Sequence, residues 1–238
     1  MMNIISALAQ SCDVFIYEVA LKTGIRKIKD MAHRLGLGDV TGIGLPGEKQ
    51  GIIPSHEWKL ANQGRVWTPG ETVVSSIGQG YVLATPLQLA VMTARLANGK
   101  QAVAPRLVKS NGDAVPDFAP LDIDPYALAI IREGMFEVMN GRFGTARNYN
   151  LDRSLGGMAG KTGTVQVKRI TKAQREVGIV NNIDRPWAER DHALFVAYAP
   201  VKRPRYAISV VVEHGGSGSS TAAPVARDIL TQLMQKQG

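Results

Sequence analysis

The chain has 238 residues, of which 45% are hydrophobic, so it is long enough to bury one substantial core. Its 28 Lys and Arg against 20 Asp and Glu give a formal net charge of +8, which is typical of a solvated surface or of attraction to an anionic polymer. The basic residues are scattered and lack interleaved aromatic side chains, so we expect no nucleic-acid partner. A single cysteine, Cys12, excludes an internal disulfide and a thiolate-cluster metal site.

No other feature indicates a metal or a cofactor, because the four histidines show no ligand spacing and we expect none to bind a metal. No apolar run approaches the roughly 18 residues of a membrane span. The start of the chain lacks the pattern of a secretory signal and opens directly on an apolar helical pattern. That opening suggests a sequence cut from a longer protein.

The first third of the chain predicts three helices, over residues 3–10, 14–24 and 25–38, with Gly24 and Gly36 as stops. Residues 39–72 are rich in Gly and Pro and predict a loop with short strands at best. Two further helices are expected at 85–99 and 124–141. Each begins with a capping residue followed by proline, Thr85 with Pro86 and Asp124 with Pro125.

The last third predicts strands at residues 160–167, 192–200 and 205–213 and a closing helix at 223–236. The short link VKRP makes the last two strands an antiparallel pair. The polar stretch 168–190 between the first two strands is long for a loop, and we hypothesise that it acts as a lid. The fold class is therefore mixed α/β (α+β), with segregated helices and an antiparallel sheet.

The stretch AGKTGTVQV at 159–167 raises the question of what Lys161 does. A phosphate-binding loop would need four residues between its two glycines and a helix afterwards, but here the spacing is too short and the pattern alternates as in a strand. Alternation places Lys161 and Gly163 on one face of the strand and Thr162 and Thr164 on the other. The cation, the two hydroxyls and a glycine that permits close approach suit a carboxylate, and an ordinary edge strand explains them equally well.

A second fragment, SCD, places Ser11 and Asp13 in a polar triplet between two apolar helical stretches. Such a triplet often only caps a helix, and Asp13 precedes one. Its combination with Lys-Thr-Gly in a strand some 150 positions later is far more specific.

Ser-x-Asn/Asp followed by Lys-Thr/Ser-Gly resembles two of the three signatures of penicillin-binding proteins and serine β-lactamases. Four blocks extend the likeness over essentially the whole chain and are similar to class B penicillin-binding proteins, the monofunctional D,D-transpeptidases. The triplet SCD and TGIGLPGE (41–48) are most similar to the penicillin-binding protein 2 group of rod-shaped Gram-negative bacteria. The blocks are SSIGQGYVLATPLQLA (75–90), GKTGTVQV (160–167), HALFVAYAP (192–200) and EHGGSGSSTAAPVARDIL (213–230).

The resemblance implies the fold of the β-lactamase and transpeptidase family, with an antiparallel sheet covered by N- and C-terminal helices and a helical subdomain. It implies a single transpeptidase domain over residues 1–238 and catalytic roles for Ser11, Asp13 and Lys161. In that scheme Ser11 belongs to the proton relay, Asp13 orients the substrate or the relay, and Lys161 supplies positive potential and holds Ser11. Thr162, Gly163 and Thr164 would bind the substrate, with the backbone N–H of Thr164 in the oxyanion hole.

The family's nucleophile belongs to a Ser-x-x-Lys motif, and no serine of this chain has a lysine three positions later. We therefore expect the C-terminal part of a transpeptidase domain that is incomplete at its N-terminus and inactive alone. The implied partners are D-Ala-D-Ala stem peptides of peptidoglycan, β-lactam antibiotics and a cell-wall elongation glycosyltransferase. The implied location is the periplasmic face of the inner membrane, through an anchor outside this chain.

Two alternatives stay open at this point. One is a β-lactam sensor or β-lactamase-like protein with the same fold. The other is a non-catalytic interaction module of the cell-wall elongation complex.

Overall fold

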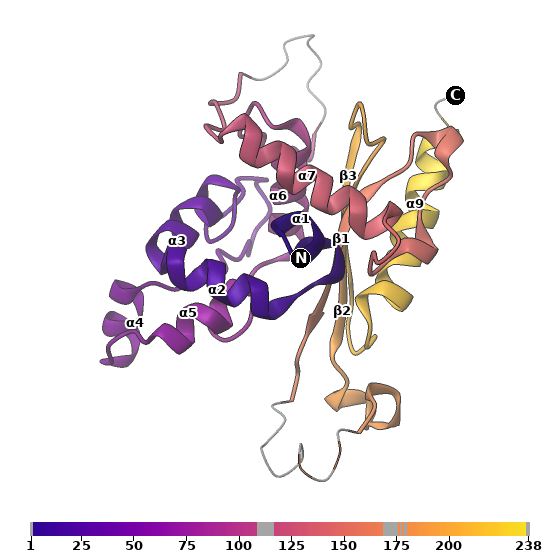
Figure 1. Cartoon of the computed structure of the whole chain (residues 1–238). Coiled ribbons are helices and arrows are strands. Elements are labelled where there is room, and N and C mark those ends of the chain that lie inside the picture. The colour runs from indigo at the N-terminus through magenta and orange to yellow at the C-terminus, as the bar shows by residue number, and fades with distance from the viewer. Residues whose placement is uncertain (1, 109–116, 169–175, 177, 179, 237–238) are drawn as a thin grey trace. The chain divides into compact units, whose positions relative to one another are not determined.

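The computed structural model describes residues 2–108, 117–168, 176, 178 and 180–236 (Figure 1). The chain divides into two compact units, Met1–Gly134 and Met135–Gly238, and each is described by itself below. The mixed α/β architecture with an antiparallel sheet is confirmed. In the described part of the chain, no helix is both long and apolar enough to cross a lipid bilayer.

The first unit begins with the three predicted helices, α1 (Ile4–Gln10), α2 (Asp13–Thr23) and α3 (Ile25–Arg34). Asn3 caps α1, since its side-chain oxygen accepts a hydrogen bond of 2.9 Å from the backbone N–H of Ser6. Gly24 ends α2 and starts α3 with φ at +80°, a conformation that favours glycine. The capping residue Asn3 and the glycine Gly24 therefore set the bounds of helices in this region.

Two short helices, α4 (His56–Gln63) and α5 (Pro69–Ser76), lie where the sequence predicts loop, so that prediction is wrong for this stretch. Capping explains both helices. The Ser55 hydroxyl oxygen accepts from the N–H of Trp58 at 3.1 Å, and Thr68 with Glu71 forms a capping box around Pro69. Eight residues carry too little periodicity to reveal a helix, and short helices depend on tertiary contacts.

An ion pair joins α4 to α5. The Nζ of Lys59 lies 2.5 Å from Glu71 Oε1 and donates to the carbonyl oxygen of Val66 at 2.8 Å. The Lys59 side chain is 7% exposed and that of Glu71 21%. Further hydrogen bonds satisfy both charges, because Lys59 also donates to Val66 and Glu71 also accepts from Thr68. Without these bonds the two charges would be costly to keep away from water.

Helices α6 (Pro86–Asn98) and α7 (Pro125–Asn140) confirm the two predicted proline-initiated helices. Thr85 caps α6, and the Asp124 carboxylate accepts from the N–H of Ala127 at 2.8 Å at the start of α7. Gln88 is fully buried in α6, and its Nε2 donates to the carbonyl oxygens of Asp39 and Gln50. One amide side chain thus fastens the Gly- and Pro-rich loop to the helix.

The second unit contains a three-stranded antiparallel sheet in the order β1–β2–β3, formed by β1 (Ala159–Val165), β2 (His192–Ala199) and β3 (Tyr206–Val212). All three predicted strands and the predicted pairing of the last two are confirmed. Among the described residues, β1 and β3 each pair only with β2, so both are edge strands. The closing helix α9 (Ala223–Gln235) packs against β2 and β3, as Figure 1 shows.

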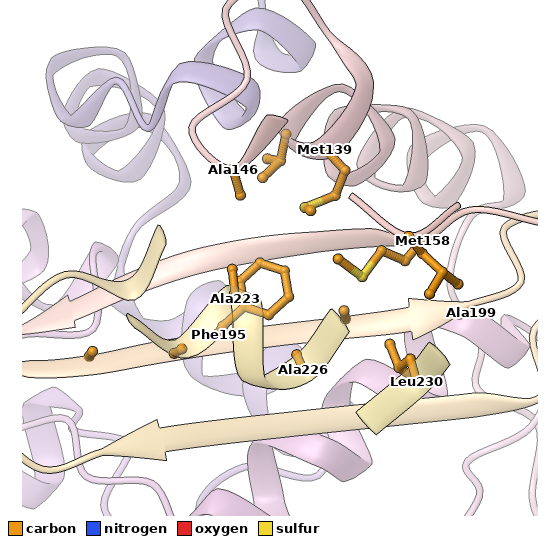
Figure 2. Close-up of a cluster of buried hydrophobic side chains, with 13 residues drawn as sticks. Met139, Ala146, Met158, Phe195, Ala199, Ala223, Ala226 and Leu230 are labelled. Atoms are coloured by element: carbon orange, nitrogen blue, oxygen red, sulfur yellow. The ribbon is translucent and has the colours of Figure 1, made fainter. Parts of the chain in front are cut away.

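The core of the second unit lies between the sheet and α9 (Figure 2). Phe195 points from β2 toward Ala223, Ala226 and Leu230 of α9 (Figure 2), and Ala197 of β2 belongs to the same core. All five residues are at most 1% exposed. Alanines on both surfaces let helix and sheet approach closely, and Phe195 fills the space that remains. The last turn of α7 adds Val138 and Met139 to this core, which fixes that turn within the second unit.

Short turns complete the second unit. The 3₁₀ helices η1, η2, η3 and η4 and the π-helical turn η5 occupy Arg147–Tyr149, Arg153–Leu155, Asn182–Asp184, Trp187–Glu189 and Gly218–Ala222. The hypothesised lid at 168–190 falls partly outside the described residues, and η3 and η4 lie in its described part.

Candidate active site

Strand β1 carries the Lys-Thr-Gly-Thr sequence along one edge of the sheet. Residues that face each other across antiparallel strands share a face, and Thr162 is opposite Phe195 and Thr164 opposite Ala193. Both threonines therefore lie on the face that carries the core of the second unit. Lys161 and Gly163, opposite Val196 and Leu194, lie on the other face, as the alternation predicts.

The Lys161 side chain is half-buried and lies along its own strand. Its Nζ donates to the carbonyl oxygen of Thr162 at 2.9 Å and lies 3.5 Å from Thr162 Oγ1. These contacts hold a positive charge beside the strand edge. A fixed cation at that edge can attract the carboxylate of a ligand.

The Thr162 hydroxyl lies 3.1 Å from the hydroxyl of Thr145, a residue that the sequence analysis did not single out. Ala146, next to Thr145, is 1% exposed and belongs to the core, so the segment that carries Thr145 is firmly placed. If the Thr145 hydroxyl donates in this pair, the proton of Thr162 stays available for a ligand oxygen. Thr164, two residues further, is exposed.

Gly163 has room for close approach from outside the strand. A β-carbon placed there would meet Leu194 Cβ at 3.3 Å, a tight contact rather than a collision. Glycine is therefore not strictly required by the packing of β1. A requirement for glycine would come from a ligand that comes near the backbone.

Ser11 forms the junction between α1 and α2 in the first unit and is the C-cap of α1. Its φ of 54° and ψ of 51° place it in the left-handed region, where a residue with a β-carbon is strained by about 1–2 kcal/mol. Ordinary helix ends avoid this strain by using glycine or asparagine at the left-handed position. Backbone strain that persists in a protein is found most often at functional positions. Asp122 and His214 share this left-handed backbone, with φ of 51° and 55°.

Asp13 is the first residue of α2, and its side chain is exposed. It does not cap the helix, because Cys12 holds the N-cap position and makes no side-chain capping bond. A carboxylate in the first turn still interacts favourably with the helix dipole. The predicted site residues thus lie in two groups, Ser11 with Asp13 in the first unit and Lys161–Thr164 in the second.

A metal centre receives no support from the described residues, among which no three histidine, cysteine or acidic side chains gather as ligands would. Ser55 comes closest to the Ser-x-x-Lys motif, with Lys59 four positions later instead of three. In the structure Ser55 caps α4, and Lys59 pairs with Glu71.

Comparison with protein-family models identifies the chain. Residues 1–231 match the model of the penicillin-binding protein transpeptidase domain. The chain belongs to this transpeptidase family. Both compact units lie largely within the matched residues, and the fold expected from the resemblance is confirmed.

Curated relatives of this transpeptidase family include two proteins named peptidoglycan D,D-transpeptidase MrdA. The one from Salmonella typhimurium is 35% identical over 247 residues, which cover 100% of this chain and 39% of the relative. The one from Acinetobacter baumannii is 37% identical over 237 residues, 94% of this chain and 34% of the relative. The chain therefore spans little more than a third of the length of these relatives.

Solved structures of the transpeptidase family agree. Pseudomonas aeruginosa PBP2 in complex with WCK 5153 superposes with a TM-score of 0.80 at 37% identity, over 98% of this chain and 47% of that one. Helicobacter pylori PBP2 in complex with MreC gives a TM-score of 0.83 at 31% identity, over 100% and 41% of the two chains. The resemblance to the penicillin-binding protein 2 group is confirmed.

Proposed function

We propose that this chain is part of the catalytic domain of a peptidoglycan D,D-transpeptidase, which cross-links D-Ala-D-Ala stem peptides during cell elongation. The observation that carries the proposal is the match of residues 1–231 to the transpeptidase family. The Lys-Thr-Gly-Thr edge of β1 and the strained Ser11 support it, since both lie at motif positions of that family.

In the proposed reaction a serine hydroxyl attacks the carbonyl of the penultimate D-Ala. The new C–O bond forms, the C–N bond to the terminal D-Ala breaks, and the serine proton moves to the departing amine. An amine of a second stem peptide then attacks the ester carbonyl, a new C–N bond forms, the C–O bond to the serine breaks, and a proton of the amine passes to the serine oxygen. None of the 238 residues is a serine with a lysine three positions later, so the proposal requires a nucleophile from elsewhere in the protein.

Each candidate residue has a role in this scheme. Lys161 supplies positive potential and, with Ser11, takes part in proton transfer, while Asp13 orients the substrate or the relay. The hydroxyls of Thr162 and Thr164 bind the terminal carboxylate of the substrate, and Thr145 orients the hydroxyl of Thr162. Gly163 lets the peptide approach, and the N–H of Thr164 donates to the oxyanion, a contact of a kind that contributes about 3 kcal/mol.

The intact protein is proposed to bind β-lactams at this site, to work beside an elongation glycosyltransferase and to reside at the periplasmic face of the inner membrane. Support comes from relatives whose names give peptidoglycan transpeptidation as their activity. The Helicobacter pylori relative, which was solved in complex with MreC, supports assembly with a further protein.

A fluorescent penicillin and nitrocefin test the proposal on the intact protein. We expect a covalent label on one serine of a Ser-x-x-Lys motif and nitrocefin trapped without turnover. Sustained hydrolysis would favour a β-lactamase, and an intact protein that carries the motif but takes no label would contradict the proposal. The 238-residue chain alone should stay unlabelled, because it lacks the hydroxyl to be acylated.

A further inference from the structure

Asp191 is a buried acid, 8% exposed, placed immediately before β2 in the second unit. Its Oδ1 accepts from the backbone N–H of Val167 at 3.2 Å, two residues beyond the end of β1. Its Oδ2 lies 3.2 Å from Asn182 Nδ2 and 3.5 Å from Arg185 Nη1, with the Arg185 side chain 14% exposed. A carboxylate at this depth persists because several donors satisfy it.

The backbone of Asp191 holds a second segment. Its carbonyl oxygen accepts from the N–H of Gly216 at 2.8 Å, within the turn that follows β3. That turn includes His214, whose φ of 55° is left-handed and whose N–H donates to His192 Nδ1 at 2.9 Å. Gly216 has φ at +81°, which favours glycine. One residue therefore connects the end of β1 with the turn 213–217.

The turn leads directly to Gly218, which is buried against the sheet at the Lys-Thr-Gly strand. A β-carbon at this residue would collide with the carbonyl oxygens of Gly163 and Leu194 and lie 3.0 Å from the amide nitrogen of Gly163. All three obstacles are backbone atoms, which cannot rotate away as a side chain can. Any side chain at position 218 must therefore displace η5 or the two strands β1 and β2 beneath it.

We infer that Asp191 and Gly218 are positioning residues for the Lys161–Thr164 edge. Asp191 fixes the end of β1 and the turn 213–217 to each other, and Gly218 sets the depth at which that turn lies on Gly163. This inference rests on the proposed function, because the edge that they place is the one that binds the substrate carboxylate. A displacement of about 1 Å in such a site typically costs about a hundredfold in rate.

The test compares benzylpenicillin with its methyl ester, which has the reactive carbonyl but no carboxylate. In the intact protein, the ratio of the acylation rates of acid and ester measures carboxylate recognition. Asp191→Asn turns one of the two acceptor oxygens into an amide N–H₂, which then faces either the N–H of Val167 or the donors of Asn182 and Arg185. We expect the ratio to fall at least about tenfold. Gly218→Ala should lower it similarly. A general loss of structure would slow both compounds alike and leave the ratio unchanged.

The double variant Asn182→Asp/Asp191→Asn is the matched rescue. It restores a donor opposite an acceptor and keeps one negative charge beside Arg185, so most of the ratio should return. Asp228→Asn is the control, since Asp228 is exposed on α9 and pairs only with its neighbour Arg227 among the contacts described. An unchanged ratio in Asp191→Asn that reacts with the ester at the original rate, or no recovery in the double variant, would overturn the inference.

Hydrogen exchange separates this inference from the proposed function. In Asp191→Asn the amides of residues 161–167 should exchange faster than in the unsubstituted protein, whether or not the protein reacts with penicillin. Unsubstituted protein that takes no acyl group contradicts the proposed function alone. If the amides of residues 161–167 exchange at the same rate in Asp191→Asn as in the unsubstituted protein, Asp191 does not fix the end of β1. This result would contradict the inference even if Gly218→Ala fails to fold.

Discussion

At the scale of single residues, two substitutions of Ser11 distinguish its effect on stability from its effect on function. Ser11→Ala and Ser11→Gly both remove the hydroxyl, and only the glycine also removes the β-carbon that strains the junction of α1 and α2. We expect the free energy of unfolding of the glycine variant to exceed that of the alanine variant by about 1 kcal/mol. Urea denaturation of the two variants measures this difference.

Both Ser11 variants should lose acylation by penicillin to the same extent, about a hundredfold, because the proposed proton relay needs the hydroxyl. A glycine variant that is no more stable than the alanine variant would show that the junction is unstrained. A variant that reacts at the original rate would remove Ser11 from the relay.

Single residues also mark where sequence reasoning ends. Lys161 and Gly163 fall on one face of β1 as predicted, because alternation in a strand is local information. Thr145 and Asp191 escaped notice, because their partners Thr162 and Val167 lie 17 and 24 positions away. The residues next to a threonine or an acid in the sequence do not indicate a contact with a residue so many positions away.

At the scale of elements, the ion pair between Lys59 and Glu71 holds α4 and α5 together. Lys59→Ala leaves the Glu71 carboxylate with its α5 contacts only, and the expected loss is about 3 kcal/mol of unfolding free energy. Lys59→Met/Glu71→Gln should be less destabilising than Lys59→Met, because glutamine keeps the capping bond to Thr68 and no charge stays unpaired. Asp228→Ala, which breaks a more exposed pair, should cost less than about 1 kcal/mol.

The same pair predicts how stability depends on pH. Burial alone would raise the pKa of Glu71, but hydrogen bonds from Lys59 and Thr68 hold this pKa below its ordinary value of 4.5. The stabilisation is therefore complete above pH 4.5 and is lost as the pH falls through the lower pKa of the folded state. Denaturation midpoints below pH 5 should fall more steeply in the unsubstituted protein than in Glu71→Gln. Parallel curves would contradict this assignment.

Among the elements, the three strands and the helices that are bounded by capping residues, proline or glycine could be predicted from the sequence. The exceptions, α4 and α5, are short and derive their stability from Lys59, whose partner Glu71 belongs to the next helix. The Thr68–Glu71 capping box with Pro69 was a signal in the sequence that could have revealed α5. For α4 the signals were the capping residue Ser55 before the helix and Gly64 after it.

At the scale of the whole molecule, the positive charge is unevenly divided. Residues 1–134 contain 13 basic and 12 acidic side chains (13 − 12 = +1), and residues 135–238 contain 15 and 8 (15 − 8 = +7). The unit that carries Lys161 should therefore attract anionic ligands over a distance of about 10 Å at moderate salt. Raising the ionic strength should slow acylation of the intact protein by benzylpenicillin several-fold and leave its methyl ester unaffected. Equal salt dependence of the two compounds would rule out such attraction.

The edge strand β3 has a practical consequence. Its sequence YAISVVV contains no charge and no proline, and in the described part of the chain only β2 pairs with it. An open strand edge of this composition is a template for intermolecular β-pairing, and Arg205 and Glu213 at its two ends are the nearest charges along the sequence that oppose such pairing. Concentrated solutions of the 238-residue chain should therefore form thioflavin-positive aggregates, and solutions that stay clear and thioflavin-negative would contradict this expectation.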